Sequence, residues 1–179
     1  GIITKNQLVK RDSDLLKQMT VYDGVMVFVS LTTLDDKLWR RMEPRTSSPQ
    51  MRLKTIQELH QAGIPVGVML APIIPGLTDV EIPVLLREAA AAGAQSAGYV
   101  VLRLPFSVKD LFEDWLMRYF PDRKEKILNR LRSLRDGKLY NSKFGERMSG
   151  KGIFADQIRD LFVMGCKKAG MPERNFKFS

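Results

Sequence analysis

Cysteine and histidine are nearly absent from this sequence of 179 residues, which contains one of each. A single cysteine, Cys166, excludes a disulfide bond within the chain and any metal site built from several of its cysteines. Its apolar neighbours predict a buried position in a helix. His60 has no partner motif. The phosphate-binding loop of nucleotide hydrolases, the GxGxxG motif and the serine turn of hydrolases are also missing. The sequence therefore excludes several common classes of site.

Long hydrophobic runs are missing as well. No apolar stretch approaches the roughly 20 residues of a membrane helix, and no signal-peptide pattern is present. The composition, with 44% hydrophobic and 27% charged residues, is ordinary for a globular protein. We therefore expect a cytoplasmic protein that does not bind membranes. Because the chain starts with Gly-Ile-Ile-Thr inside a strand pattern, we also expect a fragment of a longer protein, with N-terminal processing as the alternative.

The net charge of +9 is unevenly distributed along the chain. Residues 1–120 carry 14 lysines and arginines against 13 acidic residues, whereas residues 121–179 carry 15 against 7. A basic surface of this kind favours polyanions such as DNA or another nucleic acid. It can equally serve solubility alone, so the charge leaves both interpretations open.

Four apolar stretches predict β-strands. They are Gly1–Lys5, Val25–Leu31, the beginning of Ile64–Asp79, and Ala97–Leu104. Between them, helical patterns cover Leu15 to Met19, Leu34–Met42, Pro49 to Gly63, and Val80–Ala92. This alternation predicts an α/β fold with a parallel sheet, or part of a barrel, whose strand carboxyl ends meet at one edge.

Helix boundaries have their own sequence signals. Thr32 or Thr33 is expected to cap the second helix, and Ser48 followed by Pro49 is a typical start for the third. Thr78 and Glu81 have the spacing of a capping box, while Pro83 predicts a late start of the regular helix.

The pattern changes after Pro105. Amphipathic helices are expected over Val108–Phe120, Asp122–Arg135 and about Phe154–Ala169, with a segment of no clear period at Asp136–Gly152. We therefore divide the chain into four βα units over residues 1–105 and a basic helical extension over residues 106–179, packed on them.

Polar residues gather where the predicted strands end. Lys5 is a candidate for a carboxylate or phosphate, or an ordinary exposed lysine. Ser30 and Thr32 are candidates for a ribose, or plain helix caps. Arg103 interrupts an apolar strand, and since a buried arginine must be paired, it either binds a ligand or forms an ion pair with Glu43 or Asp79.

Several segments together resemble the radical SAM superfamily, in particular its DNA repair photolyase-like branch, related to spore photoproduct lyase. The resemblance covers nearly the whole chain and is specific only as a combination. Its main segments are Ile3-Thr4-Lys5-Asn6, Val29-Ser30-Leu31-Thr32-Thr33-Leu34-Asp35, Glu43-Pro44-Arg45, Ala71-Pro72-Ile73-Ile74-Pro75-Gly76-Leu77-Thr78-Asp79, Leu102-Arg103-Leu104-Pro105 and Arg147-Met148-Ser149-Gly150.

The resemblance implies a partial (β/α)6 barrel, similar to a TIM barrel, in which the four strands are the third to the sixth. It also implies an enzyme of lyase or oxidoreductase type that uses S-adenosylmethionine and a 4Fe–4S cluster. The CxxxCxxC loop that binds the cluster in this family is absent here, and Cys166 is in the wrong place to substitute. We therefore expect the C-terminal part of such an enzyme, unable to bind the cluster and inactive alone.

The resemblance also implies the residues of a cofactor wall. Lys5 would reach the cofactor carboxylate, and Ser30 and Thr32 its ribose or carboxylate. Ile74 and Gly76 would flank adenine, Asp79 would close that loop, and Arg103 and Leu104 would border adenine or substrate. No catalytic residue and no metal ligand is assigned.

Two further expectations remain. The alternative function, from another class, is a non-catalytic, basic α/β module that binds nucleic acid. A half-barrel exposes strand edges, so we also expect self-association or pairing of the first strand with another chain.

Overall fold

The computed structural model describes residues 1–140 and 147–172. In this part of the chain, four strands form one sheet in the order β1-β2-β3-β4, and each pairs in parallel with the next. The strands are β1 (Ile2–Thr4), β2 (Val27–Ser30), β3 (Val66–Ile73) and β4 (Ala97–Val101). The predicted α/β class and parallel sheet are therefore confirmed.

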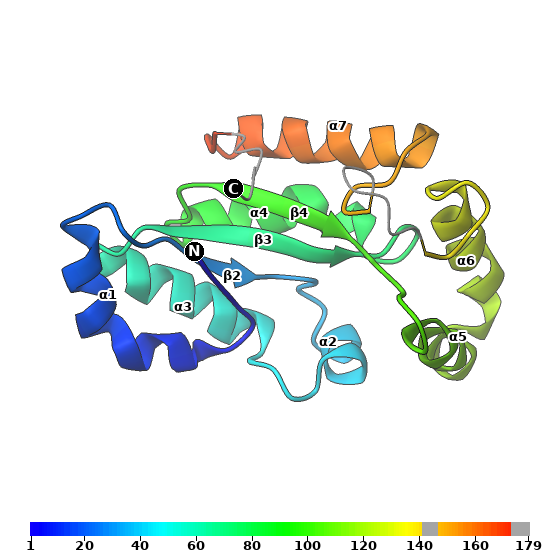
Figure 1. The fold of residues 1–179 in the computed structure, drawn as a ribbon, viewed down its shortest axis with the longest axis horizontal. Helices are drawn as coiled ribbons and strands as arrows, with labels where there is room; N and C mark the ends of the chain where they lie inside the picture. Colours follow the sequence, from blue (N-terminus) through cyan, green and yellow to red (C-terminus); the bar gives the residue numbers. More distant parts are fainter. Residues whose placement is uncertain (141–146, 173–179) are drawn as a thin grey trace.

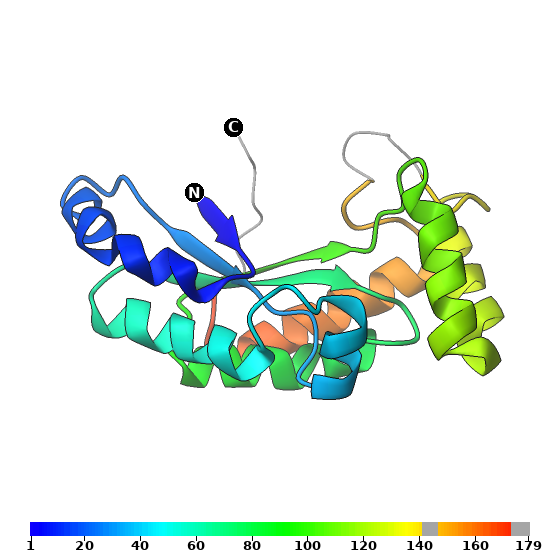
Figure 2. The same ribbon diagram turned by 90° about the horizontal axis from the view of Figure 1, so that it is seen from below.

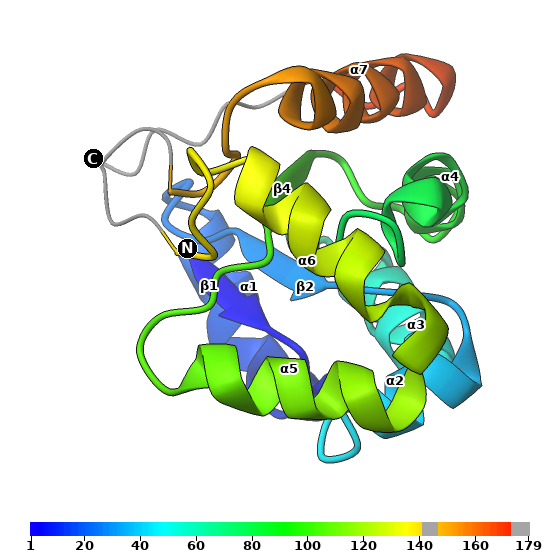
Figure 3. The ribbon, with the colours of Figure 1, turned by 90° about the vertical axis from the view of Figure 1, so that its right-hand side faces the viewer.

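Helices connect the strands, and most of them pack on one face of the sheet. Figures 2 and 3 show α3, α4 and α7 along that face, with α1 and α2 nearer the first two strands. The bounds are α1 (Ser13–Thr20), α2 (Asp36–Met42), α3 (Pro49–Gln61), α4 (Ile82–Ala91) and α7 (Ile153–Lys168), with short 3-10 helices η1 (Gln7–Asp12) and η2 (Asp79–Glu81).

The first hydrophobic core lies between the sheet and these helices. Val27 and Val66 from the strands are fully buried, as are Ile56 of α3 and Leu86 of α4. The helix α7 packs directly on α4, since a Cβ atom added at Gly165 would lie 2.6 Å from Leu86 Cδ1.

Cys166 lies in α7 and is fully buried in this first core. The position predicted for it from its apolar neighbours is therefore confirmed.

A second core lies beyond the carboxyl ends of β3 and β4, where Figure 1 shows α5 and α6. The helices α5 (Val108–Tyr119) and α6 (Lys124–Ser133), joined by η3 (Pro121–Arg123), bury Leu116 and Leu128 against Ile74 and Leu104. The two helices therefore cover the loop that follows β3, which is the position that the sequence suggested for a ligand site.

Some predicted boundaries were wrong. The strand β4 ends at Val101 and not at Leu104, because its pairing with β3 shifts register and Val101 N donates to Met148 O at 2.8 Å. Arg103 therefore follows the strand and does not interrupt it. The helix α2 begins at Asp36, and Asp35 caps it by accepting bonds from the backbone of Lys37 and Leu38. Neither Thr32 nor Thr33 is that cap.

The predicted capping box at Thr78 and Glu81 was also wrong. Glu81 instead accepts hydrogen bonds from Thr33 Oγ1 at 2.7 Å and Leu34 N at 2.8 Å, and so joins η2 to the segment after β2. The late helix start at Pro83 is confirmed, since α4 begins at Ile82 after η2. Ser48 caps α3 as predicted.

The sheet is consistent with consecutive units of a TIM-like barrel. That these are strands three to six of a partial (β/α)6 barrel, and that the chain divides after residue 105, stay predictions. The strand β1 lies at one edge of the sheet with Ile3 50% exposed, and self-association through it also stays a prediction. In the described residues, no helix has the length and apolarity to cross a membrane.

Candidate functional site

Lys5 follows β1 and lies at the carboxyl edge of the sheet. Its ammonium group donates hydrogen bonds to Glu43 Oε1, to Thr32 Oγ1 at 3.3 Å and to Ala71 O at 2.9 Å. The Thr32 hydroxyl also lies 2.9 Å from Ala71 O. An ammonium has three N–H donors, so protein acceptors satisfy all three. To reach a cofactor carboxylate, Lys5 must exchange one of these contacts.

Arg52 on α3 is the third charged residue of this cluster. Its side chain is 2% exposed, and its guanidinium donates to Glu43 Oε2 at 2.6 Å, Ser30 O at 3.0 Å and Ser47 O at 2.8 Å. Thr46 accepts a further bond from it. We call Lys5, Glu43 and Arg52 the ion-pair network. It fixes the end of β2, where Ser30 is 3% exposed.

The electrostatics of the ion-pair network are those of a carboxylate between two cations. Burial opposes the charge on Glu43, but Lys5 and Arg52 outweigh it and lower the pKa of Glu43. Burial lowers the pKa of Lys5, with the charge of Glu43 acting in the opposite direction. Because Glu43 balances one of the two cations, the ion-pair network as a whole keeps one positive charge.

The loop after β3 forms the other predicted part of the wall. Ile74 is fully buried in the second core, and its N–H donates to Thr78 Oγ1 at 2.9 Å. Gly76 has a positive φ of 85° and lies against Arg130 of α6. Asp79 Oδ2 lies 3.6 Å from Arg130 Nη1. The loop is therefore held by α6, and its side chains face that helix.

Arg103 and Leu104 belong to the same region. Leu104 is 1% exposed in the second core. In the described part of the chain, Arg103 forms no ion pair with Glu43 or with Asp79, since Glu43 binds the other two members of the ion-pair network and Asp79 lies against Arg130. The intramolecular pairs suggested for Arg103 are absent there.

The structure thus brings Lys5 and Thr32 together at Ala71 O of β3, while Ser30 binds Arg52 through its backbone carbonyl. Ile74, Gly76 and Asp79 lie in the loop that packs against α6. Their assignment to a cofactor stays a prediction. The sequence analysis did not single out Arg52, although it lies four residues before Ile56 and so on the inward face of α3. An arginine at an inward helical position was the signal that could have found it.

The described residues do not fit an iron–sulfur cluster. They contain no group of three or more His, Cys, Asp or Glu side chains that could hold a metal ion. Cys166 is buried in α7, which packs on α4 and not at the carboxyl edge of the strands. Thiolates are the usual ligands of such clusters, so a cluster would require residues from outside this part of the chain.

Comparison with protein families shows what the first half of the chain is similar to. Residues 1–89 match the model of the Radical SAM superfamily. The match covers β1 to β3 and most of α4, and therefore includes Lys5, Ser30, Thr32 and the loop after β3. It implies S-adenosylmethionine and a 4Fe–4S cluster as cofactors of the family. It suggests an enzyme and does not define the reaction.

Relatives extend the similarity into the second half of the chain. An uncharacterized protein of Mycobacterium tuberculosis is 37% identical over 136 residues, which cover 75% of this chain and 39% of that protein. An uncharacterized protein of Methanocaldococcus jannaschii is 34% identical over 81 residues, covering 45% of this chain and 30% of that protein. An uncharacterized protein of Acidianus two-tailed virus is 39% identical over 74 residues, which cover 41% of this chain and 24% of that protein.

The chain therefore matches less than two thirds of the length of each of these relatives. No solved structure matches this chain.

Proposed function

We propose that this chain forms part of a radical SAM enzyme, and that the carboxyl edge of its sheet is one wall of the S-adenosylmethionine pocket. The observation that carries the proposal is the family match over residues 1–89, which covers the segments that the structure brings to this edge. Parallel α/β sheets bind ligands at this edge. A cluster of this family needs three cysteine ligands, and these 179 residues contain one cysteine.

The roles of the chain's own residues follow from their contacts. The ion-pair network holds the ends of β1 and β2 in place, because Lys5 binds the Thr32 hydroxyl and Arg52 binds the Ser30 carbonyl. The hydroxyl groups of Thr32 and Ser30 would bind the ribose or carboxylate of the cofactor. Arg130 fills the space beside Gly76, so adenine would lie against the other side of the loop after β3.

Substitution of the short hydroxyl residues tests this wall. In the protein encoded by the longest reading frame that contains this sequence, Ser30→Ala or Thr32→Val should weaken S-adenosylmethionine binding about tenfold, as expected for loss of one or two hydrogen bonds. Isothermal titration calorimetry measures the dissociation constant. Thr20→Val, at the last residue of α1, is the matched control. Unchanged binding in both site variants would contradict the wall.

The proposal also includes the branch of the family, the substrate and the type of enzyme. The branch related to DNA repair photolyases, with DNA as substrate, is supported by the sequence resemblance and by the basic last third of the chain. The lyase or oxidoreductase type follows from the same resemblance. The printed names of the relatives state no activity.

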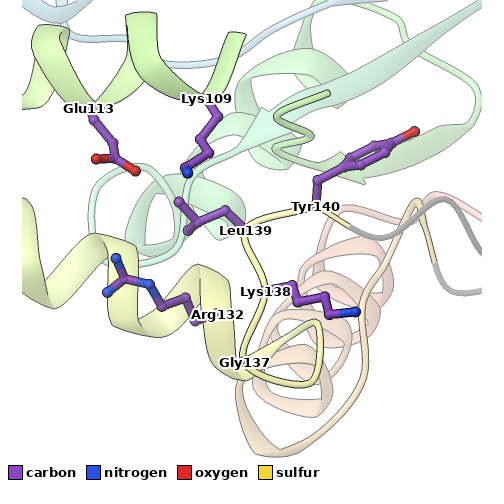
Figure 4. Close-up of a pocket in the computed structure, with 7 residues that line it drawn as sticks. All are labelled: Lys109, Glu113, Arg132, Gly137, Lys138, Leu139 and Tyr140. Carbon is purple, nitrogen blue, oxygen red and sulfur yellow. The ribbon is translucent and has the colours of Figure 1, made fainter. Parts of the chain in front are cut away.

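A second candidate function, binding of nucleic acid, is favoured by a groove between α5 and α6. Figure 4 shows Lys109 and Glu113 projecting from α5 and Arg132 from α6, while Lys138 and Tyr140 belong to the loop after α6. The groove has a volume of about 470 Å³.

Phe106 adds a second aromatic ring near this groove. It is 91% exposed, and its ring centroid lies 6.5 Å from that of Tyr140. Basic residues beside exposed aromatic rings suit a single-stranded nucleic acid, because its bases stack on the rings and its phosphates meet the charges.

Fluorescence anisotropy with labelled single-stranded DNA at several salt concentrations tests this groove. The variants Lys138→Gln and Tyr140→Ala should each weaken binding several-fold, and Lys138→Gln should also reduce its salt dependence. Lys54→Gln on the exposed side of α3 is the matched control. If all three variants bind as the natural sequence does, the groove is not the nucleic-acid site.

A further inference from the structure

Two arginine side chains lie next to each other just beyond the end of β4. Arg135 follows α6, and its Nη2 donates to Leu102 O at 2.5 Å. Arg103 is the next residue after Leu102. The two guanidinium groups influence each other, since burial first, and then the charge of Arg103, lower the pKa of Arg135. Two positive charges therefore lie at the carboxyl edge of the sheet, beside the second core.

These guanidinium groups have donors without acceptors. Nε and Nη1 of Arg135 and Nε of Arg103 are buried and have no hydrogen-bond partner in the described parts of the chain. Arg135 is 1% exposed. The remaining contact of Arg103 is to Met148 Sδ at 3.8 Å, and a thioether is a weak acceptor.

A buried cation without a partner destabilises a fold, because water no longer solvates it and nothing replaces that solvation. Buried cations are usually stabilised by a carboxylate, as Glu43 stabilises Lys5 and Arg52 in the ion-pair network. In the described residues no carboxylate forms an ion pair with Arg103 or Arg135, so these two groups lack that stabilisation. Such unsatisfied groups require an explanation, and a bound ligand is one.

We propose that Arg103 and Arg135 form a binding site for a phosphate group. Two guanidinium charges balance a phosphate dianion, and its terminal oxygens offer acceptors for the N–H groups of the three unsatisfied nitrogen atoms. Guanidinium is suited to this role because it remains charged when desolvated and donates in fixed directions. A carboxylate carries one charge and two oxygens, and so would leave one cation unbalanced.

Access to the site lies beside Met148. Its side chain is only partly buried, and the flexible thioether chain can turn away from Arg103 without breaking a strong hydrogen bond. The backbone there is held in place, since Met148 O accepts from Val101 N and Leu134 O accepts from Lys151 N at 3.1 Å. A phosphate would therefore replace one weak side-chain contact.

If the proposed function is correct, this phosphate site also limits the chemical class of the substrate. S-adenosylmethionine contains no phosphate group, so a phosphate bound here belongs to the substrate. The substrate class is then a phosphorylated small molecule or a nucleotide unit, with its phosphate beyond β4 and its reacting part toward β1 to β3. This placement follows from the order of the strands in the sheet.

Titration with inorganic phosphate tests the site directly. Calorimetry and thermal unfolding of the 179-residue chain at constant ionic strength should show phosphate binding and stabilisation that acetate and chloride do not give. Arg103→Gln should weaken phosphate binding about tenfold or more, as expected for a lost charge-assisted bond. Arg118→Gln, an exposed arginine on α5, is the matched control and should bind as the natural sequence does.

Arg135→Met provides an independent variant. Replacing an unpaired buried cation by an apolar side chain is often neutral or stabilising, so this variant should fold and lose its response to phosphate. Equal stabilisation by phosphate, acetate and chloride, or an undiminished response in Arg103→Gln, would overturn the proposal. Neither readout requires an iron–sulfur cluster or S-adenosylmethionine. Failure here therefore leaves the proposed function intact, and loss of cofactor binding leaves the phosphate site intact.

Discussion

Glu43 Oε2 accepts a hydrogen bond from Arg52 Nη2 at 2.6 Å, which ties the end of α2 to the first turn of α3. The other oxygen of the same carboxylate binds Lys5, which follows β1. The carboxylate therefore joins three segments that are distant in sequence. It fixes the ends of the first two strands, where the proposed cofactor wall begins.

Removal of this carboxylate should strongly destabilise the fold. Glu43→Gln keeps the shape but leaves Lys5 and Arg52 as neighbouring cations in a largely buried place, for which we expect a loss of about 3 kcal/mol or more in the free energy of unfolding. Urea unfolding measures it. Glu88→Gln removes a surface ion pair with Arg87 and should cost less than about 1 kcal/mol. Equal effects of the two variants would contradict the role of the ion-pair network.

The same group predicts a dependence of stability on pH. The pKa of Glu43 is lowered in the folded state from its ordinary value of 4.5, so the unfolded chain takes up this proton first as the pH falls. The stabilisation is complete above about pH 4.5 and is lost as the pH falls through the lowered folded value. Urea midpoints between pH 7 and pH 3 should fall less steeply in Glu43→Gln. The same slope in both proteins would contradict this.

The close contact at Gly76 can be separated from backbone strain by comparison with Gly63. Both have positive φ, 85° and 77°, but a Cβ atom at Gly76 would lie 3.0 Å from Arg130 Nη1, whereas nothing lies within 4 Å at Gly63. Gly63→Ala should cost about 1 kcal/mol for strain alone, and Gly76→Ala should cost more. Thermal unfolding gives both values. Equal losses would show that α6 does not press on this loop.

The packing of α7 on α4 gives a further test. Alanine is favoured over glycine inside a helix by about 1 kcal/mol, but Gly165→Ala would place a methyl group against the fully buried Leu86. We expect a net destabilisation of about 1 to 2 kcal/mol. Met164→Ala, at an adjacent exposed position, should be nearly neutral. A stabilised Gly165→Ala variant would contradict the close packing.

The sequence predicted the sheet well because its signals are local. Continuous apolar runs mark strands buried on both faces, and Ser48 with Pro49 marks a helix start, so the order of strands and helices followed without tertiary information. Boundaries were less secure. The end of β4 depends on Met148, a partner that lies 47 residues beyond Val101, and no local pattern predicts such a contact.

The contacts of the site residues were also not predictable from local sequence. The position of Lys5 at the edge followed from its place after a strand, but its partners did not. Glu43 was one of two carboxylates suggested as an ion-pair partner of Arg103, and it instead binds Lys5 and Arg52. Arg135 gave no signal, because its burial depends on how α6 packs beyond the strand ends. Pairing of charges is decided by tertiary packing, which single positions in a sequence do not encode.

We propose that this chain belongs to a radical SAM enzyme, as its match over residues 1–89 suggests. The most direct measurement is iron and acid-labile sulfide analysis of the protein encoded by the longest reading frame that contains this sequence, purified without oxygen. We expect a brown protein with about four iron and four sulfide ions per molecule, as a 4Fe–4S cluster requires. A colourless, iron-free protein that also fails to bind iron and sulfide on reconstitution would contradict it.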